Sequence, residues 1–391
     1  MNILLSIAIA LAAGLAVSRL IRLIHLPNVT AFLIAGLLIG PSVLGILTEE
    51  ATLALDSFTT VALGFIAYSI GGEFKLSYLK EIGVRPIVIT LFEGLTAAVA
   101  VFGVMWALGF DLALCLALGA IATATAPAAT LMVVRQYKAK GPVCATLLPV
   151  VAMDDALCLM CFSICSAIAV ALTSGQEMSA WVMLGKPLLE IVGALALGTA
   201  IGFVEIICSR FFRSRGNKLA LSIACVMLGV GLCEMWGLSS LLVCMMIGAV
   251  MINLASDRSV LVEQCDRFTP PLFLLFFVLS GANLDLSILP QVGLLGAVYL
   301  LSRAAGKWAG ASIGASLTKC EPNVRKYLGL TLLPQAGVAI GMAHMSSTVL
   351  PAYGPQINAV VLCATLIYEL VGPVITKVAL TRAGEISAER A

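Results

Sequence analysis

Long apolar stretches follow one another along almost the whole chain, and they limit its fold more than any other feature. The first is NILLSIAIALAAGLAVSRL, next to the N-terminus. A membrane-spanning helix needs about 20 mainly apolar residues. Only 11% of the 391 residues are charged, against about 25% in a soluble domain. Lipid offers no hydrogen-bond partners to the backbone, and a helix satisfies its backbone N–H and C=O groups within its own segment. Apolar runs of this length therefore predict an all-α polytopic membrane protein.

The distribution of charge predicts how the chain crosses the membrane. We expect about 13 membrane-spanning helices from the apolar runs. Basic residues such as Lys138 and Arg210 gather in the connections after odd-numbered spans and in the C-terminal tail. The positive-inside rule then places the N-terminus outside and the C-terminus in the cytoplasm. Lys186, Arg303 and Lys307 break the pattern, and the last two fall inside a span.

The chain also repeats itself at a constant offset. LALGAIATATAPAATL (116–131) aligns with KYLGLTLLPQAGVAIG (326–341), so that Thr125 falls on Gln335, an offset of 210 (335 − 125). The same offset sets SIGGEFKLSYL beside VLSGANLDLSIL, and VTAFLIAGLLIG roughly beside LSSLLVCMMIG. Matched spans are an odd number apart, so the second copy crosses in the opposite direction. This predicts an inverted repeat of six helices each plus a linker helix, an architecture of many secondary transporters.

Two spans carry a proline at matching positions of the repeat. In ATATAPAATLMVV, Thr125 and Thr130 flank Pro127, and in LTLLPQAGVAIGM, Pro334 precedes Gln335. Proline removes a backbone donor and disturbs the preceding turn. Backbone left open in this way survives in a membrane only where protein or a water-filled cavity covers it. We therefore predict two discontinuous helices that cross at the functional site. Two simple proline kinks are the alternative.

Two pairs of charged residues stand out within apolar spans. Asp154 and Asp155 are adjacent in VAMDDALCLM, and Arg303 and Lys307 lie four residues apart in RAAGKWAGASIG. A charge at the bilayer centre costs at least ~2.5 kcal/mol, and such residues usually mark ion pathways. Neighbouring helical residues point about 100° apart, so only one aspartate can face Lys307. The other is free to hold either a proton or a cation, which is the chemistry of an antiporter.

A purely structural interpretation of these charges is also available. They could form a salt-bridge network that only holds the helices together. Arg303 would then pair with one of the acids Glu93, Glu190 and Glu369. We interpret Glu93 as structural and leave the role of Glu369 open. The cysteines are scattered through apolar runs, where a free thiol packs as a small hydrophobic group, so we expect no metal centre made by them.

These motifs together resemble the bacterial monovalent cation:proton antiporters of the NapA, NhaA and Kef type. LPNVTAFLIAGLLIGPSVLG (26–45) is similar to the second-span signature of that family, and VVAMDDALCLM to its paired-aspartate helix. TATAPAATLMVV and LLPQAGVAIGM resemble its two unwound helices, and RAAGKWAGASIG (303–314) the span with its lysine. The resemblance covers nearly the whole chain.

The resemblance implies roles for individual residues. Asp155 would be the carboxylate shared by the proton and the transported Na⁺, and Asp154 with Lys307 would form an ion pair that opens and closes. Thr125, Thr130 and Gln335 would join the ion site. The supporting candidates would be Arg303, Glu369, Pro127 and Pro334. Relatives often carry an acid where this chain has Ala126, and Arg-Gly-Glu after the second proline, so the choice among Na⁺, Li⁺ and K⁺ stays open.

The resemblance also implies a division of the chain. Residues 1–82 and 216–288 would form a scaffold that mediates a homodimer. Residues 83–173 and 289–391 would form an ion-transporting core with a short cytoplasmic tail, joined by a linker helix within 174–215. The core would move against the scaffold as an elevator in the bacterial inner membrane. We expect no C-terminal regulatory domain, no cofactor and no nucleic-acid partner.

Other functions fit the sequence less well. A sodium-coupled symporter of an organic anion on a similar fold is the main alternative, with Arg303 as the anchor of the anion. An intramembrane aspartyl protease needs its two aspartates on different helices, but here they are adjacent. A sensor without transport is a third alternative. We therefore predict that the chain is not an enzyme and that antiport is its function.

Overall fold

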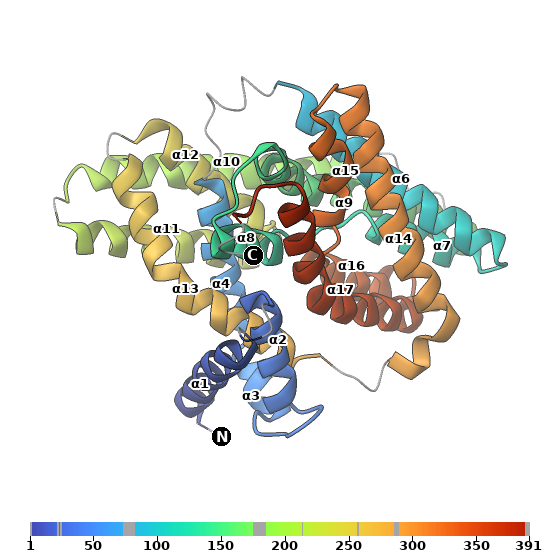
Figure 1. Cartoon of the computed structure of the whole chain (residues 1–391), viewed down its shortest axis with the longest axis horizontal. Helices are drawn as coiled ribbons and strands as arrows, with labels where there is room; N and C mark the ends of the chain where they lie inside the picture. The colour runs from blue at the N-terminus through green and yellow to red at the C-terminus, as the bar shows by residue number, and fades with distance from the viewer. Residues whose placement is uncertain are drawn as a thin grey trace. The chain divides into compact units, whose positions relative to one another are not determined.

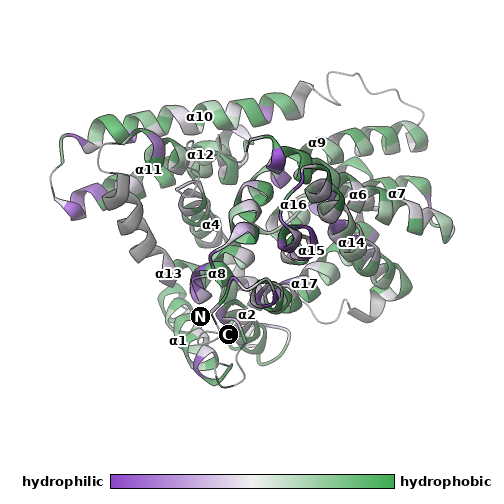
Figure 2. Ribbon diagram, turned by 45° about the horizontal axis from the view of Figure 1, so that its top comes forward, coloured by the Kyte–Doolittle hydropathy of each residue, from purple (hydrophilic) through white to green (hydrophobic). Residues whose placement is uncertain are grey.

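The computed structural model describes residues 2–21, 23, 26–72, 83–174, 185–212, 214–255, 258–284 and 289–387, and its regular elements there are helices joined by turns and short irregular segments. Within these residues there are sixteen helices and no strand (Figure 1). Six of the helices are long and apolar enough to cross a membrane, and Figure 2 shows hydrophobic residues along most of the length of the helices. The prediction of an all-α membrane protein is confirmed.

The helices divide into two compact units, each built from separate stretches of the chain. The first unit comprises Met1–Leu20, Ala31–Gly83 and Leu188–Asn283, and the second Ile21–Thr30, Val84–Pro187 and Leu284–Ala391. The first unit holds most or all of α1 (Ile3–Ile21), α2 (Asn28–Ile39), α3 (Glu49–Ala54), α4 (Asp56–Gly71), α10 (Lys186–Ser209), α11 (Arg215–Trp236), α12 (Ser240–Leu254) and α13 (Arg258–Ala282). The second unit holds α6 (Arg85–Ala107), α7 (Leu112–Ile121), α8 (Pro127–Tyr137), α9 (Pro142–Ser174), α14 (Leu289–Leu317), α15 (Pro322–Thr331), α16 (Gly337–Val349) and α17 (Gly354–Arg382).

Parts of the predicted organisation lie outside the described residues. They are 175–184 and 213 of the expected linker, 73–79 and 285–288 of one repeat pair, and the last four residues of the tail. The described part of the linker is α10, which groups with the first unit.

In the first unit, glycines let pairs of helices touch along their backbones. A Cβ at Gly71 of α4 would lie 2.8 Å from the Met245 carbonyl carbon, and one at Gly248 of α12 would lie 3.0 Å from the Gly72 nitrogen. Helices in lipid gain little from the hydrophobic effect between them, so they associate through such close van der Waals contacts.

In the second unit, three glycines on one face of α14 allow it to pack closely against α6. A Cβ at Gly306 would lie 2.7 Å from Ala97 Cα, one at Gly310 2.6 Å from Glu93 Cα, and one at Gly314 2.9 Å from Ile89 Cα. The three glycines recur every four residues, so they lie on one face of the helix. This close approach sets Glu93 against the part of α14 that carries Lys307.

We expect Gly310→Leu to destabilise the second unit, because its side chain would meet the backbone of α6 at Glu93. Overpacking typically costs about 1–3 kcal/mol, so the midpoint of thermal unfolding in detergent should fall by several degrees. Gly341→Leu is the matched control, since a Cβ at this helical glycine has open space. Equal unfolding temperatures for the two variants would contradict this account of the α6–α14 contact.

Two spans of the second unit are interrupted at their middles, and the interruptions touch. Residues 122–126 separate α7 from α8, and residues 332–336 separate α15 from α16. Pro127 begins α8, and Pro334 lies within the second break. The Ala126 N–H donates to the Pro334 carbonyl at 2.8 Å, and the Thr130 hydroxyl donates to the Thr331 carbonyl at 3.1 Å. The two breaks therefore lie side by side, which excludes the alternative of two separate proline kinks.

Candidate ion-binding site

The two aspartates lie within the long helix α9 of the second unit. This helix spans 33 residues, and Asp154 and Asp155 fall near its middle. The side chains are 0% and 1% exposed. Consecutive positions on a helix point in different directions, so the two carboxylates have different surroundings.

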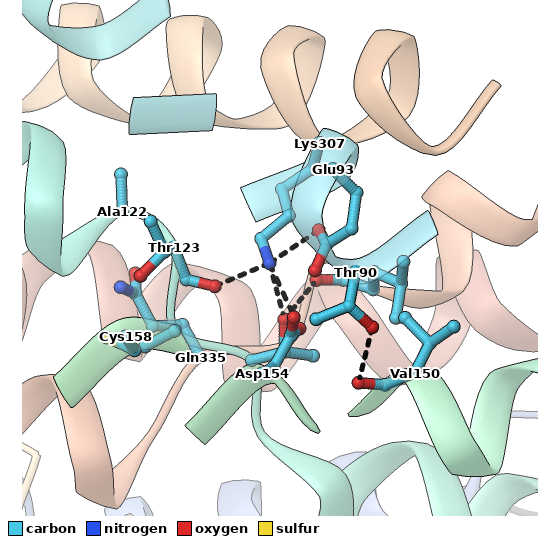
Figure 3. Close-up of polar contacts among 12 residues, drawn as sticks. Thr90, Glu93, Ala122, Thr123, Val150, Asp154, Cys158, Lys307 and Gln335 are labelled. Atoms are coloured by element: carbon cyan, nitrogen blue, oxygen red, sulfur yellow. Dashed lines mark hydrogen bonds and ion pairs between the residues drawn. The ribbon is translucent and has the colours of Figure 1, made fainter. Parts of the chain in front are cut away.

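Lys307 reaches from α14 into a cage of oxygens (Figure 3). Its Nζ lies 2.7 Å from Glu93 Oε2 and 3.2 Å from Asp154 Oδ2. It also donates to the Thr123 carbonyl at 2.6 Å and to Thr125 Oγ1 at 2.8 Å. An ammonium group has three N–H donors, so these four oxygens compete for them. Asp154 Oδ2 is the most distant of the four oxygens.

Asp155 is buried without a donor. Neither of its oxygens accepts a hydrogen bond within the described part of the chain. Its carboxylate interacts electrostatically with Asp154 and with Lys307. Burying a charged carboxylate without a hydrogen-bond donor costs free energy. A bound cation can compensate this charge, and a proton can remove it. The position therefore suits a small positive ligand.

Arg303 holds the two breaks together instead of pairing with an acid. Its Nε donates to the Ala122 carbonyl at 3.0 Å and its Nη2 to the Ala124 carbonyl at 2.6 Å. Nη1 donates to the Leu333 carbonyl at 2.8 Å. The guanidinium also lies 4.5 Å from the centroid of the Tyr368 ring. The interpretation in which Arg303 pairs with Glu93 or Glu369 is wrong, because its Nε, Nη1 and Nη2 donate to carbonyls that the helix breaks leave without partners in a helix. Glu190 belongs to the first unit, so its pairing with Arg303 stays a prediction.

Arg303→Lys is expected to lower the unfolding temperature by several degrees. Lysine is a point charge that cannot reproduce the planar fork of donors, so carbonyls of the breaks lose their partners at about 1–3 kcal/mol each. Thermal unfolding in detergent measures the effect. Arg382→Lys, at an exposed position of the last turn of α17, is the control. An Arg303→Lys protein that unfolds like the wild type would refute this role.

The other predicted site residues lie around the breaks. Gln335 Nε2 donates to the Ile121 carbonyl at 3.1 Å and to the Tyr299 hydroxyl at 2.9 Å. Gln335 thus caps the end of α7, away from the Lys307 amino group. Thr125 contacts Lys307 and also donates to the Leu332 carbonyl at 3.4 Å. Thr130 bonds across the breaks, as described above.

The supporting candidates have separate surroundings. A Cβ at Gly372 of α17 would lie 2.9 Å from Pro334 Cγ, so α17 packs tightly on the second break. Glu369, one turn earlier on the same helix, is 3% exposed. The structure does not place Glu369 among the partners of Lys307.

Glu93 was interpreted from the sequence as a structural residue, and its contact with Lys307 was not predicted. Its carboxylate makes the shorter of the two ion-pair contacts of Lys307. A signal for it was present, because at the offset of the repeat Glu93 corresponds to Arg303 (303 − 93 = 210). It therefore lies on the helix that matches the lysine-bearing span. Glu93 is fully buried with the aspartates, so the site contains three carboxylates.

Comparison with known proteins decides the family. A model of the family described as "Sodium/hydrogen exchanger, transmembrane" matches residues 7–382. The chain belongs to the sodium/hydrogen exchanger family. The predicted membership of the cation:proton antiporter superfamily is thereby confirmed. Members of this family are membrane transporters, so the chain is a transporter and not an enzyme.

Two solved structures have a similar fold. The sodium proton antiporter MjNhaP1 from Methanocaldococcus jannaschii, determined at pH 8, matches with a TM-score of 0.76 and 18% sequence identity, over 98% of each chain. A three-dimensional electron-microscopy map of the same protein matches with a TM-score of 0.75 and 18% identity, over 98% of this chain and 95% of that one. No match was found among curated proteins. At this identity the likeness concerns the fold.

Proposed function

We propose that this protein exchanges a monovalent cation, Na⁺ before Li⁺ or K⁺, for protons, with Asp155 as the carboxylate that both ligands share. The observation that carries the proposal is that Asp155 is buried and has no hydrogen-bond donor in the described structure, while the neighbouring Lys307 is already surrounded by other oxygens. A proton and a cation can each neutralise this carboxylate, but both cannot occupy it well. Binding of one therefore expels the other.

The charge balance of the site supports this mechanism. Glu93, Asp154 and Asp155 bring three carboxylates, whereas Lys307 neutralises only one. The second cationic group nearby, Arg303, directs its donors at backbone carbonyls. Uncompensated charges are too costly in a buried site, so the remaining carboxylates must hold protons or a transported cation. The excess of carboxylates over basic groups therefore favours a site that exchanges protons for a cation.

In the proposed cycle, Lys307 changes partners when Asp155 changes ligand. When Asp155 exchanges its proton for Na⁺, the electrostatic field at the Lys307 ammonium changes. The ion pair between Lys307 and Asp154 opens or closes in response. Glu93 and the oxygens of the first break keep Lys307 in place during this exchange. Asp155 would be the protein's main ligand for Na⁺, and Na⁺ is the cargo. We expect no resident cofactor.

We also propose the organisation in which this exchange takes place. Counting each broken pair as one span and leaving out the six-residue α3, the sixteen helices correspond to 13 spans. The helix bounds support the repeat, because α7 (112–121) and α15 (322–331) differ by the offset of 210 at both ends. The first unit would serve as the scaffold of a homodimer, and the second as the core that moves as an elevator. The protein would lie in the inner membrane, with its N-terminus outside and its C-terminus in the cytoplasm.

The anion symporter loses its main support. Its anchor was to be Arg303, but Nε, Nη1 and Nη2 each donate to a carbonyl, which leaves little capacity for an anionic substrate. Proteoliposomes loaded with a pH indicator test the proposal directly. Addition of Na⁺, Li⁺ or K⁺ outside the vesicles should drive protons out of them, opposite to the movement of the cation, without any organic solute. Cation flux that appears only with an organic anion would favour symport.

A further inference from the structure

The segment that follows α17 folds back onto the start of α9. The chain reverses at Gly384, whose φ is 78°. The Gly384 N–H donates to the Thr381 carbonyl and the Glu385 N–H to the Leu380 carbonyl, both at 3.0 Å. This pair of bonds with a left-handed glycine between them is a Schellman ending, which satisfies the last carbonyls of the helix and fixes the direction of exit.

The Glu385 carboxylate then binds the open N–H groups of α9. Oε1 accepts from the Val143 N–H at 2.6 Å, and Oε2 accepts from the Cys144 N–H at 2.9 Å. The Glu385 carbonyl accepts from the Lys140 N–H at 3.0 Å. The first N–H groups of a helix have no partner within it, and the N-terminus attracts negative charge. Glu385 thus provides the cap that the residue before the helix, Gly141, cannot provide from a side chain of its own.

Packing around the carboxylate shows a built site. A Cβ at Gly141 would lie 2.5 Å from Glu385 Cγ and 2.6 Å from its Oε1, so only glycine leaves room for the carboxylate there. Glu385 and Ile386 are 7% and 5% exposed. Asn323 of α15 donates through Nδ2 to the Ala383 carbonyl at 3.0 Å. The segment is therefore held by both α9 and α15.

We propose that the first turn of α9 is a carboxylate-binding site, which Glu385 fills from within the same chain as a latch. The latch fixes one end of the helix that carries Asp154 and Asp155 to the end of α17. The class of ligand is a small carboxylate, because the two N–H groups donate to the two oxygens of one carboxylate. This inference goes beyond the proposed transport function and does not depend on it.

Removal of the latch and its replacement by a free anion test the proposal. Glu385→Ala should lower the unfolding temperature of the full chain in detergent by about 4–10 °C, since two charge-assisted bonds are lost. Sodium acetate should restore a large part of this loss, whereas sodium chloride at the same concentration, which keeps the cation constant, should not. Glu321→Ala is the matched control, because Glu321 precedes α15 without any side-chain cap bond. Acetate should leave the control and the wild type unchanged.

A second variant separates the site from the residue that fills it. Gly141→Ala keeps Glu385 but places a methyl group where the carboxylate sits, so it should lower the unfolding temperature without any recovery in acetate. The proposal is overturned if Glu385→Ala unfolds at the wild-type temperature. It is equally overturned if acetate stabilises Glu385→Ala no more than chloride does.

Discussion

Asp155→Asn is expected to abolish cation-driven proton exchange, because it removes the buried carboxylate that is proposed to carry the transported ion. The amide cannot release a proton and bind the cation in its place, so the competition on which exchange depends disappears. The folded protein should be as stable as the wild type or more so, because the substitution removes a buried charge that has no donor. Fluorescence of a pH indicator in proteoliposomes measures the exchange, and thermal unfolding in detergent measures the stability.

The control for this variant is Asp155→Glu, which keeps the carboxylate and should retain part of the exchange. A structural role for Asp155 would reverse the pattern. In that case Asp155→Asn would lose stability and would keep exchange in proportion to the folded fraction. Exchange at the wild-type rate in Asp155→Asn would refute its role as the shared ligand.

Lys307→Met is expected to destabilise the protein by about 3–5 kcal/mol, the usual cost when one partner of a buried ion pair is removed. Glu93 and Asp154 both lose their cation, and the carbonyl of Thr123 loses a donor. The unfolding temperature of the variant in detergent, compared with that of the wild type, measures this effect.

A combined variant shows whether the cost comes from charge. Adding Glu93→Gln and Asp154→Asn to Lys307→Met should restore most of the stability, because neither partner of Lys307 is then a carboxylate without a cation. Cation-driven proton exchange should be absent from this triple variant. Lys326→Met, at an exposed position of α15, is the control for loss of a lysine. If the combined variant were as unstable as Lys307→Met alone, packing of the lysine stem and not its charge would hold this part of the protein together.

The sequence was informative where a residue stood out against its surroundings. Asp154, Asp155 and Lys307 are charges in apolar runs, so their position in the membrane could be expected without coordinates. The prolines at 127 and 334 marked the helix breaks, because proline disturbs a helix through its own covalent structure. The constant offset of the repeat then indicated that the two breaks belong together.

Partners could not be predicted in the same way. Which acid reaches Lys307 depends on how closely α14 approaches α6, and this follows from the contacts of Gly306, Gly310 and Gly314 with another helix. The structural alternative paired Arg303 with an acid, but its donors bind carbonyls that become available as partners only once both breaks are formed. The Glu385 side chain caps α9 across more than two hundred positions of the sequence, so no local sequence pattern could predict this contact.

The most direct test of the central claim is whether Na⁺ displaces a proton from the purified protein. NaCl is added to the protein in weakly buffered detergent solution, and the change of pH is measured for wild type and Asp155→Asn, with choline chloride as the control for ionic strength. Competition at Asp155 predicts proton release from the wild type that saturates with Na⁺ and is absent from Asp155→Asn. Proton release of equal size from both proteins would contradict the assignment of Asp155. Saturable binding of Na⁺ to the wild type without any release would contradict the competition itself.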